Sequence, residues 1–278
     1  MRVVNFFRTT ILLATLTAIF IGVGFLIGGF FGASMALIIA LAINFFSYWY
    51  SDKIILKVYK AVPLKNEKIE AMVKEISKKA GISPPKLYYI KTDVPNAFAT
   101  GRNDKNSCVV ITSGLINTLE DNEIKGVLAH EISHIKNRDI LVSTIAATIG
   151  GAISYLANIA WYSLFFSSED RNSLILLPLI FLAPVAALVV QMGISRGREY
   201  LADYSAGLTT KDPLSLASAL RKIEEFVSKN PIRGNHATSH LFIVNPFRAD
   251  SLSRLFSTHP STKSRISKLE ELNNRLNR

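Results

Sequence analysis

Residues 121–138 read Asp121-Asn-Glu-Ile-Lys-Gly-Val-Leu-Ala-His-Glu-Ile-Ser-His-Ile-Lys-Asn-Arg138, and this stretch decides the fold. Its apolar residues recur three and four positions apart, which predicts an amphipathic helix over residues 119–136 with Asp121 as its N-terminal cap. The apolar face consists of Ile124, Val127, Leu128, Ile132 and Ile135. His130 and His134 are four residues apart, so their side chains lie on one face of that helix.

The sequence His130-Glu131-Ile-Ser-His134 has the spacing of a zinc site. Two imidazoles one helical turn apart can bind one zinc ion, which polarises a water molecule and the carbonyl of a peptide bond. Glu131 stands beside the pair, so its carboxylate can take a proton from that water and pass it to the leaving amine. The alternative is a surface helix with two incidental histidines. Because the helix is amphipathic, capped and flanked by charges, we favour the zinc site.

A catalytic zinc ion needs a third protein ligand. Asn137 and Ile140 occupy the positions where a metzincin has glycine and histidine, so that class of metalloprotease is excluded. The better source is a predicted helix over residues 198–206, which carries Glu199 and Asp203 four positions apart. This helix follows a long apolar segment that begins after the first helix ends. If that segment folds as a hairpin, the second helix returns beside the first.

The two carboxylates of that second helix then lie close to the two imidazoles. One of Glu199 and Asp203 can ligate zinc, and the other can hold a ligand imidazole through its second N–H group. In the alternative interpretation, both acids form solvated ion pairs with Arg196 and Arg198.

Four uncharged segments are long enough to cross a bilayer, since about 20 helical residues span roughly 30 Å of hydrocarbon. They are residues 9–29, 30–50, 140–166 and 173–194. Gly28 and Gly29 indicate a turn between the first two segments, and the polar stretch 167–172 indicates a turn between the last two. The sequence therefore predicts four transmembrane helices in two hairpins.

The chain of 278 residues is 49% hydrophobic and carries a net charge of +11. Such a charge fits a nucleic acid or an anionic membrane surface, and no nucleic-acid-binding motif is present. We therefore expect the lipid bilayer as a partner and no nucleic acid. Lysine and arginine flank the outer ends of both hairpins, which predicts that both termini and the segment between the hairpins are cytoplasmic. Cys108 is the single cysteine, so no intrachain disulfide forms.

These segments divide the chain into four parts. Residues 1–50 form an N-terminal transmembrane hairpin, and residues 140–194 form a second one. Residues 51–139 and 195–278 are expected to make one cytoplasmic domain, which the second hairpin interrupts. Its first part carries the two histidines and its second part the third zinc ligand.

The soluble parts have the pattern of a mainly helical α+β domain. Further helices are predicted over residues 66–80, 214–229 and 260–276, with Gly81 ending the first and Pro260 beginning the last. Strands are predicted over residues 86–90, 97–100 and 107–112, the last two joined by a turn at 101–105. Residues 230–258 form a long loop or mixed segment, and its length leads us to expect that it restrains access to the site.

Five motifs occur in a fixed order along the chain. They are Pro95-Asn-Ala-Phe-Ala-Thr-Gly101, Val127-Leu-Ala-His-Glu-Ile-Ser-His134, Ser195-Arg-Gly-Arg-Glu-Tyr-Leu-Ala-Asp203, Val244-Asn-Pro246 and Leu255-Phe-Ser-Thr-His-Pro-Ser261. Together they resemble the HtpX-type membrane metalloproteases, relatives of the zinc CAAX-prenyl proteases. The combination is far more specific than the histidine motif alone.

The resemblance implies a gluzincin-like zinc metalloprotease domain with one zinc ion per chain. In such a domain the ion is bound by His130, His134 and Glu199, and Glu131 is the catalytic acid and base. Asp203 then has the other role considered above, which is to hold the imidazole of a zinc ligand. The resemblance also implies a zinc metalloendopeptidase of the bacterial inner membrane that degrades misfolded or damaged membrane proteins as part of a stress response.

Two further roles follow from the resemblance. The strand that contains Asn96, Ala97 and Phe98 is expected to be an edge strand that binds the substrate backbone by β-augmentation. His259 is expected to face the cleft and stabilise the tetrahedral oxyanion. A histidine that only makes a structural hydrogen bond at the start of a helix is an equal alternative for His259.

Other interpretations of the chain are open at this point. His236 and His240 are four apart without an adjacent acid, and a loop pair is the simplest account of them. An intramembrane protease would carry the histidine motif inside an apolar segment, whereas here the motif has charged flanks. A zinc-binding scaffold does not need Glu131. A CAAX-processing enzyme is a third alternative, and the short chain favours general quality control instead. Arg265 is expected to be an ion-pair partner.

Overall fold

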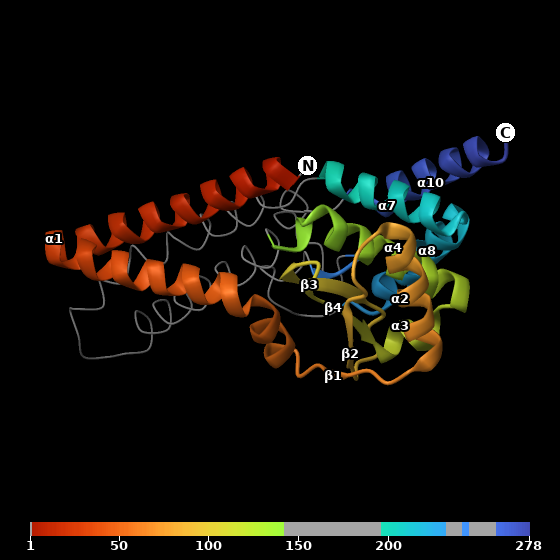
Figure 1. Cartoon of the computed structure of the whole chain (residues 1–278), viewed down its shortest axis with the longest axis horizontal. Helices are drawn as coiled ribbons and strands as arrows, with labels where there is room; N and C mark the ends of the chain where they lie inside the picture. The colour runs from red at the N-terminus through yellow and green to blue at the C-terminus, as the bar shows by residue number, and fades with distance from the viewer. Residues whose placement is uncertain (1, 142–195, 232–240, 245–259) are drawn as a thin grey trace.

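The computed structural model describes residues 2–141, 196–231, 241–244 and 260–278, and the fold is given for these residues. A small sheet is covered by helices, and a long helical arm projects from this body (Figure 1). The mainly helical α+β class expected from the sequence is confirmed. The second predicted hairpin, apart from its first two residues, and most of the predicted loop at 230–258 lie outside the described residues.

Helix α1 spans Arg2–Val58 and folds back on itself at a glycine pair. Gly28 and Gly29 leave helical geometry, and Gly29 has φ 58°, a left-handed conformation that glycine adopts without a steric penalty. The two arms touch so closely that a Cβ atom on Gly32 would lie 2.1 Å from the carbonyl oxygen of Gly24. The Nδ2 atom of Asn44 also donates a hydrogen bond to Oγ1 of Thr17 at 2.9 Å, which joins the arms. The predicted turn between the first two apolar segments is confirmed.

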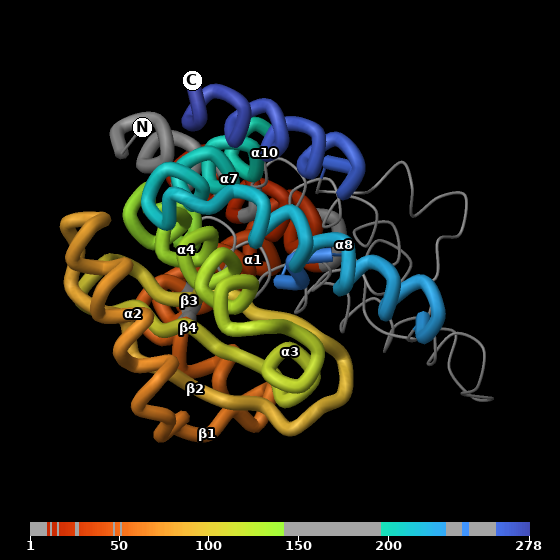
Figure 2. Tube along the Cα trace, turned by 90° about the vertical axis from the view of Figure 1, so that its right-hand side faces the viewer, coloured from red at the N-terminus to blue at the C-terminus, as the bar shows by residue number. Residues whose placement is uncertain are grey.

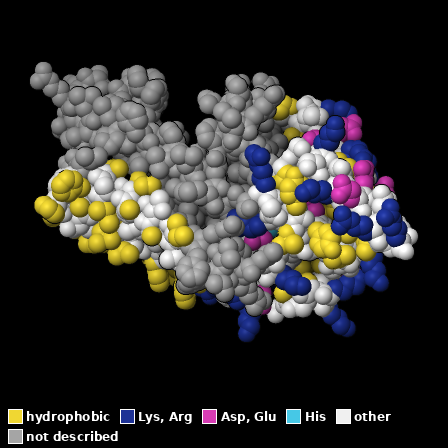
Figure 3. All heavy atoms as spheres, turned by 90° about the horizontal axis from the view of Figure 1, so that it is seen from above, with side chains coloured by type: hydrophobic (Ala, Val, Ile, Leu, Met, Phe, Trp, Pro, Cys, Tyr) yellow, Lys and Arg dark blue, Asp and Glu magenta, His cyan; other side chains and the backbone are white. Residues whose placement is uncertain are grey.

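Among the described residues, one helical segment, Gly28–Tyr50, is long and apolar enough to cross a membrane. The first arm contains a shorter apolar stretch, Leu13–Phe25. In Figure 3 hydrophobic side chains cover the projecting arm, whereas lysine and arginine side chains gather on the body. One of the four predicted transmembrane helices therefore meets this criterion of length and composition.

The sheet has the strand order β1-β2-β4-β3. Its strands are β1 (Val62–Pro63), β2 (Lys86–Ile90), β3 (Ala97–Asn103) and β4 (Asn106–Thr112). β3 pairs antiparallel with β4, β2 pairs parallel with β4, and the two-residue β1 adds an antiparallel edge that the sequence did not predict. Strands β3 and β4 extend beyond the predicted bounds into the turn. There Gly101 has φ 137°, and a Cβ atom on it would lie 2.2 Å from the carbonyl oxygen of Asn106.

The helices begin and end at residues that satisfy their free backbone groups. In α2 (Glu67–Ala80), the Asn66 side chain accepts a hydrogen bond from the Ile69 N–H group, and Gly81 ends the helix in a left-handed conformation. Helix α4 spans Asp121–Asn137. It follows the short helix α3 (Ser113–Thr118), which was not predicted, after two residues. The predicted cap of α4 was wrong by one residue. Glu120 is the N-cap, and its N–H group donates to the Glu123 carboxylate at 2.8 Å, so Asp121 is already helical.

Three helices follow in the second part of the domain. They are α7 (Arg196–Thr210), α8 (Pro213–Lys229) and α10 (Thr262–Leu276). The predicted start of α10 was also wrong. Ser261 is the N-cap, with its hydroxyl accepting from the Ser264 N–H group at 3.3 Å, so Pro260 precedes the helix instead of beginning it. Figure 2 shows α7 and α10 side by side on the side of α4 away from the sheet.

The sheet has an apolar layer on each face because its residues alternate. On one face Val109 and Ile111 join α2, α4 and α8 in the main core. On the other face Phe98 and Val110 pack with Ile55 from the end of α1. Cys108 is buried in β4, as expected for a small hydrophobic residue in a strand. The sheet thus connects the core that surrounds α4 to the projecting arm.

Candidate active site

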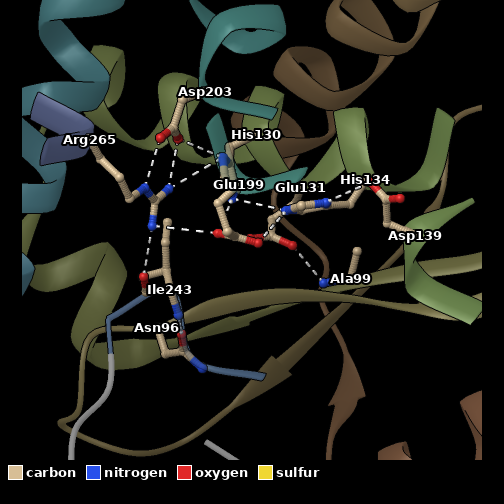
Figure 4. Close-up of polar contacts among 10 residues, drawn as sticks. All are labelled: Asn96, Ala99, His130, Glu131, His134, Asp139, Glu199, Asp203, Ile243 and Arg265. Atoms are coloured by element: carbon tan, nitrogen blue, oxygen red, sulfur yellow. Dashed lines mark hydrogen bonds and ion pairs between the residues drawn. The ribbon is translucent and has the colours of Figure 1, made fainter. Parts of the chain in front are cut away.

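Helix α4 lies at the centre of the domain and carries the predicted site residues His130, Glu131 and His134. It packs against α2 and β3 on one side and against α7 and α8 on the other. Helix α7 brings Glu199 and Asp203 to the same place, although 65 positions separate His134 from Glu199 (199 − 134 = 65). The two histidines and the two acids therefore come together as the hairpin argument predicted (Figure 4).

Three side chains converge on one point. The Nε2 atoms of His130 and His134 are 3.1 Å apart. The two carboxylate oxygens of Glu199 lie 3.7 Å from Nε2 of His130 and 3.4 Å from Nε2 of His134. One donor atom from each residue falls within 4.8 Å of the others, which makes a group able to hold a metal ion. Two imidazoles and one carboxylate are a donor set that suits zinc and leaves a coordination position open.

The imidazole of His130 is held from behind by Asp203. Its Nδ1 atom lies 2.9 Å from Oδ1 of Asp203. Arg265 from α10 holds that carboxylate with two hydrogen bonds, from Nη2 at 2.7 Å and from Nε at 2.8 Å. All three side chains are at most 2% exposed, so the solvated ion pairs considered for Asp203 are absent and Arg265 is the buried ion-pair partner. Burial alone raises the pKa of Asp203, but Arg265 outweighs it and lowers the pKa to about 2.

The imidazole of His134 is held in the same way by Asp139, which sequence reasoning missed. Nδ1 of His134 lies 3.2 Å from Oδ2 of Asp139. Asp139 comes close because Arg138 ends α4 in a left-handed conformation, φ 59°, which turns the chain back toward the helix. A proton on Nδ1 of each histidine satisfies its carboxylate and leaves the Nε2 lone pair free for a metal. The sequence signal that could have pointed to Asp139 was the presence of an acid five positions after His134.

The electrostatics of the group favour a cation. Burial by itself lowers the pKa of His134, but the negative charges of Glu199 and Asp139 outweigh it and raise that pKa well above 6.5. A proton is therefore retained where two carboxylates meet the imidazoles. A divalent cation at the same point supplies this positive charge and replaces the proton.

Glu131 lies on the sheet side of the group. Its Oε2 atom accepts a hydrogen bond from the backbone N–H group of Ala99 in β3 at 2.8 Å. Burial is the main cause that raises the pKa of Glu131, and the charges of His130 and His134 offset part of that rise. A buried carboxylate with a raised pKa beside a metal-binding group has the properties of a general base.

The residues proposed for substrate binding, Asn96, Ala97 and Phe98, directly precede Ala99 at the start of the edge strand β3. The amide of Asn96 is engaged on both sides: Nδ2 donates to the Leu241 carbonyl at 3.1 Å, and Oδ1 accepts from the Ile243 N–H group at 3.0 Å. Phe98 points to the opposite face, where its ring packs against Tyr59. The Ile243 carbonyl in turn accepts from Arg265 at 3.0 Å, which connects the short segment 241–244 to the group around His130. His236, His240 and His259 lie outside the described residues.

Comparisons with known proteins assign the chain to a peptidase family. The model of Peptidase family M48 matches residues 63–273. The chain belongs to peptidase family M48. The match includes His130, Glu131, His134 and Glu199, so the whole donor group lies in the M48 region. The resemblance inferred from the motifs is confirmed, and the protein is a metalloprotease.

Two proteins described as Protease HtpX homologs are similar to the chain over almost their full length. A Protease HtpX homolog of Persephonella marina is 48% identical over 281 residues, covering 97% of this chain and 98% of that protein. One from Pyrococcus furiosus is 48% identical over 274 residues, covering 95% of each. The crystal structure of S. mikatae Ste24p superposes with a TM-score of 0.49 and 20% identity, covering 93% of this chain and 61% of that one.

We predict that Arg265→Gln strongly destabilises the metal-free domain. It leaves the buried Asp203 carboxylate without its ion-pair partner, which costs about 3–5 kcal/mol. The matched control is Arg221→Gln, because Arg221 and Glu270 form an exposed pair at 3.7 Å and such pairs contribute about 0–1 kcal/mol. Thermal unfolding of each variant in mild detergent measures the difference. Equal shifts for the two variants contradict the prediction.

Proposed function

We propose that the protein is a membrane-anchored zinc endopeptidase with one zinc ion held by His130, His134 and Glu199. The observation that carries the proposal is the convergence of the three donor groups, with each imidazole oriented by its own carboxylate. Because the donors are buried and preorganised, little rearrangement is needed to bind the ion.

The side chains around the ion have separate roles in peptide hydrolysis. When bound, zinc supplies the positive charge that polarises the peptide carbonyl and lowers the pKa of a water molecule. Glu131 takes the proton of the attacking water and delivers it to the leaving nitrogen. Asp203 holds His130 so that its Nε2 atom faces the ion. His259, beyond the described residues, is the proposed donor to the oxyanion.

The substrate binds along β3 as an added strand. β3 is an edge strand, and its Ala99 N–H group already points at Glu131. Because the side chains of Asn96 and Phe98 are engaged elsewhere, recognition through this strand uses backbone groups, including those of Ala97. Backbone pairing does not select for side chains, which suits an enzyme that degrades many damaged proteins.

Unfolded or damaged membrane proteins are the proposed substrates, and quality control is the proposed role. The site is close to the projecting arm: the guanidinium of Arg102, at the end of β3, lies 4.4 Å from the ring centroid of Trp49 in α1. Tryptophan and tyrosine gather at membrane interfaces. Trp49 and Tyr50 end the apolar segment, so the edge strand lies beside the membrane surface, where segments of damaged membrane proteins emerge.

The position of α4 argues against the rival functions. The helix is packed among the sheet, α7 and α8 of a folded domain and is not one of the helices apolar enough to cross a membrane, whereas an intramembrane protease carries its motif in such a helix. A zinc scaffold has no use for a buried acid beside the donors, whereas Glu131 occupies that place.

We further propose the membrane topology expected from the sequence. Residues 1–50 and 140–194 form two transmembrane hairpins, and residues 51–139 and 195–278 form one catalytic domain on the cytoplasmic side of the cell membrane. Lysine and arginine at the outer ends of the hairpins support this orientation.

The first test of the proposal is casein cleavage by the purified, zinc-loaded chain in mild detergent. Loss of the general base in Glu131→Gln should lower the rate by about 10²–10⁴-fold while zinc stays bound, which elemental analysis checks. Glu224→Gln, the same change at an exposed position of α8, should cleave like the wild type. Cleavage by Glu131→Gln at the wild-type rate would contradict the proposed mechanism.

Zinc affinity should fall as the pH falls. The pKa of His134 in the metal-free protein is raised well above 6.5, so a proton competes with zinc below that pKa. One competing proton weakens apparent affinity by up to about tenfold per pH unit. Competition with a chromophoric chelator, calibrated at pH 8, 7 and 6, measures the effect. A constant affinity over this range contradicts it.

Cysteine labelling in intact cells tests the topology. Burial raises the pKa of the Cys108 thiol to about 12, so the native cysteine gives little background. A membrane-impermeant maleimide should label Phe31→Cys, at an exposed position directly after the turn of α1, in intact cells. It should label Asn122→Cys, at the exposed start of α4, only after lysis. The reverse pattern contradicts the proposed orientation.

A further inference from the structure

The two imidazoles of the metal-binding group are supported by matching chains of contacts. Behind His130 lies Asp203, and behind Asp203 lies Arg265. Behind His134 lies Asp139, whose other oxygen, Oδ1, is 3.6 Å from Nη1 of Arg198. Each imidazole therefore has a buried carboxylate on its Nδ1 side, and each carboxylate has a buried arginine (Figure 4 draws the two carboxylates and Arg265).

The second chain of contacts joins two helices at the donor group. Asp139 comes two residues after the end of α4, and Arg198 is in the first turn of α7, next to Glu199. They are 59 positions apart (198 − 139 = 59) and are 3% and 8% exposed. A buried ion pair at this place connects the helix that carries both imidazoles to the helix that carries the third donor.

Asp139 does not itself belong to the donor set. Its carboxylate contacts Nδ1 of His134, whereas the three converging donors are gathered around Nε2. An acid on the far nitrogen fixes the ring orientation and the tautomer of a ligand without reaching the metal.

From this geometry we infer that Asp139 is a positioning residue for the zinc site and that Arg198 acts on the site through Asp139. The inference deepens the proposed function and rests on it. Asp139 holds the His134 ring with Nε2 toward Glu199, and Arg198 holds Asp139 while fixing the first turn of α7 against the end of α4. Arg265 binds Asp203 with two hydrogen bonds of 2.7 and 2.8 Å, whereas the ion pair between Arg198 and Asp139 is longer, at 3.6 Å. Because Arg198 acts on His134 through Asp139 across this longer contact, its effect on the zinc site is smaller than that of Asp139.

The test measures zinc affinity of the full-length chain in detergent by chelator competition, independently of proteolysis. Asp139→Ala should weaken zinc binding about 10–100-fold, the usual cost of losing such a support. Arg198→Gln should weaken it less, and Arg198→Lys, which keeps the charge, should restore part of the loss. In the Asp139→Ala background, Arg198→Gln should cause no further loss of zinc affinity, because the Asp139 carboxylate through which Arg198 acts is already absent.

A control separates positioning from general stability. Glu123→Gln removes a buried carboxylate of the same helix, paired with Lys222 at 2.8 Å and distant from the donors, and should leave zinc affinity unchanged. Asp139→Asn keeps the shape of the side chain and carries the test if Asp139→Ala does not fold. With cobalt in place of zinc, Asp139→Asn should shift the visible absorption bands of the bound metal, and Glu123→Gln should not.

Three outcomes overturn the inference. They are wild-type zinc affinity in Asp139→Ala or Asp139→Asn, an equal loss in Glu123→Gln, and full additivity of the Asp139 and Arg198 changes. Failure of the proposed function gives a different result, because the wild-type chain itself then binds no stoichiometric zinc.

Discussion

The balance of buried charge at the end of α4 is the constraint on which the rest of the structure depends. Four acids and two arginines are buried around the two imidazoles; they are Glu131, Asp139, Glu199, Asp203, Arg198 and Arg265. When all the acids are ionised, their charge exceeds that of the arginines by two (−4 + 2 = −2). An apolar interior tolerates such an excess only when a cation compensates it. A divalent ion at this point would therefore contribute to the electrostatic balance of the fold.

The sheet positions this charge cluster relative to the arm. Val109 and Ile111 pack toward α4, while Phe98 and Val110 on the opposite face pack toward the end of α1. The sheet thus lies between the end of α1 and Glu131, and β3 contacts both of them. Because packed interiors are dense and resist deformation, β3 fixes the position of the Glu131 carboxylate relative to the end of α1.

Features with a local cause could be predicted from the sequence. Asn66 and Gly81 bound α2 as expected, and the spacing of His130 and His134 placed both rings on one face. Features that depend on contacts between distant parts of the chain could not be predicted from the sequence. Asp139 reaches His134 because Arg138 adopts a left-handed conformation. Arginine rarely adopts this conformation, so nothing in the sequence indicated it. Arg265 was expected in an ion pair, but no pattern could name Asp203 as its partner across 62 positions. The predicted N-cap of α4 was wrong by one residue, because Glu120 and Asp121 are both acids and the sequence pattern favours aspartate as a cap. The helices of the second hairpin and the roles of the site residues stay predictions.

The order of the site residues along the chain has a consequence for biosynthesis. The histidine pair is complete at residue 134, Glu199 follows 65 positions later, and Arg265 follows 66 positions after that (265 − 199 = 66). At about 5–20 residues per second, the ribosome needs on the order of 10 s to pass from the imidazoles to the arginine that secures Asp203. Until Glu199 has been made, a nascent chain holds the two imidazoles without the third member of the converging group, and until Arg265 has been made, its Asp203 carboxylate lacks its ion-pair partner. The buried charge cluster can therefore assemble only late in synthesis, after most of the domain has left the ribosome.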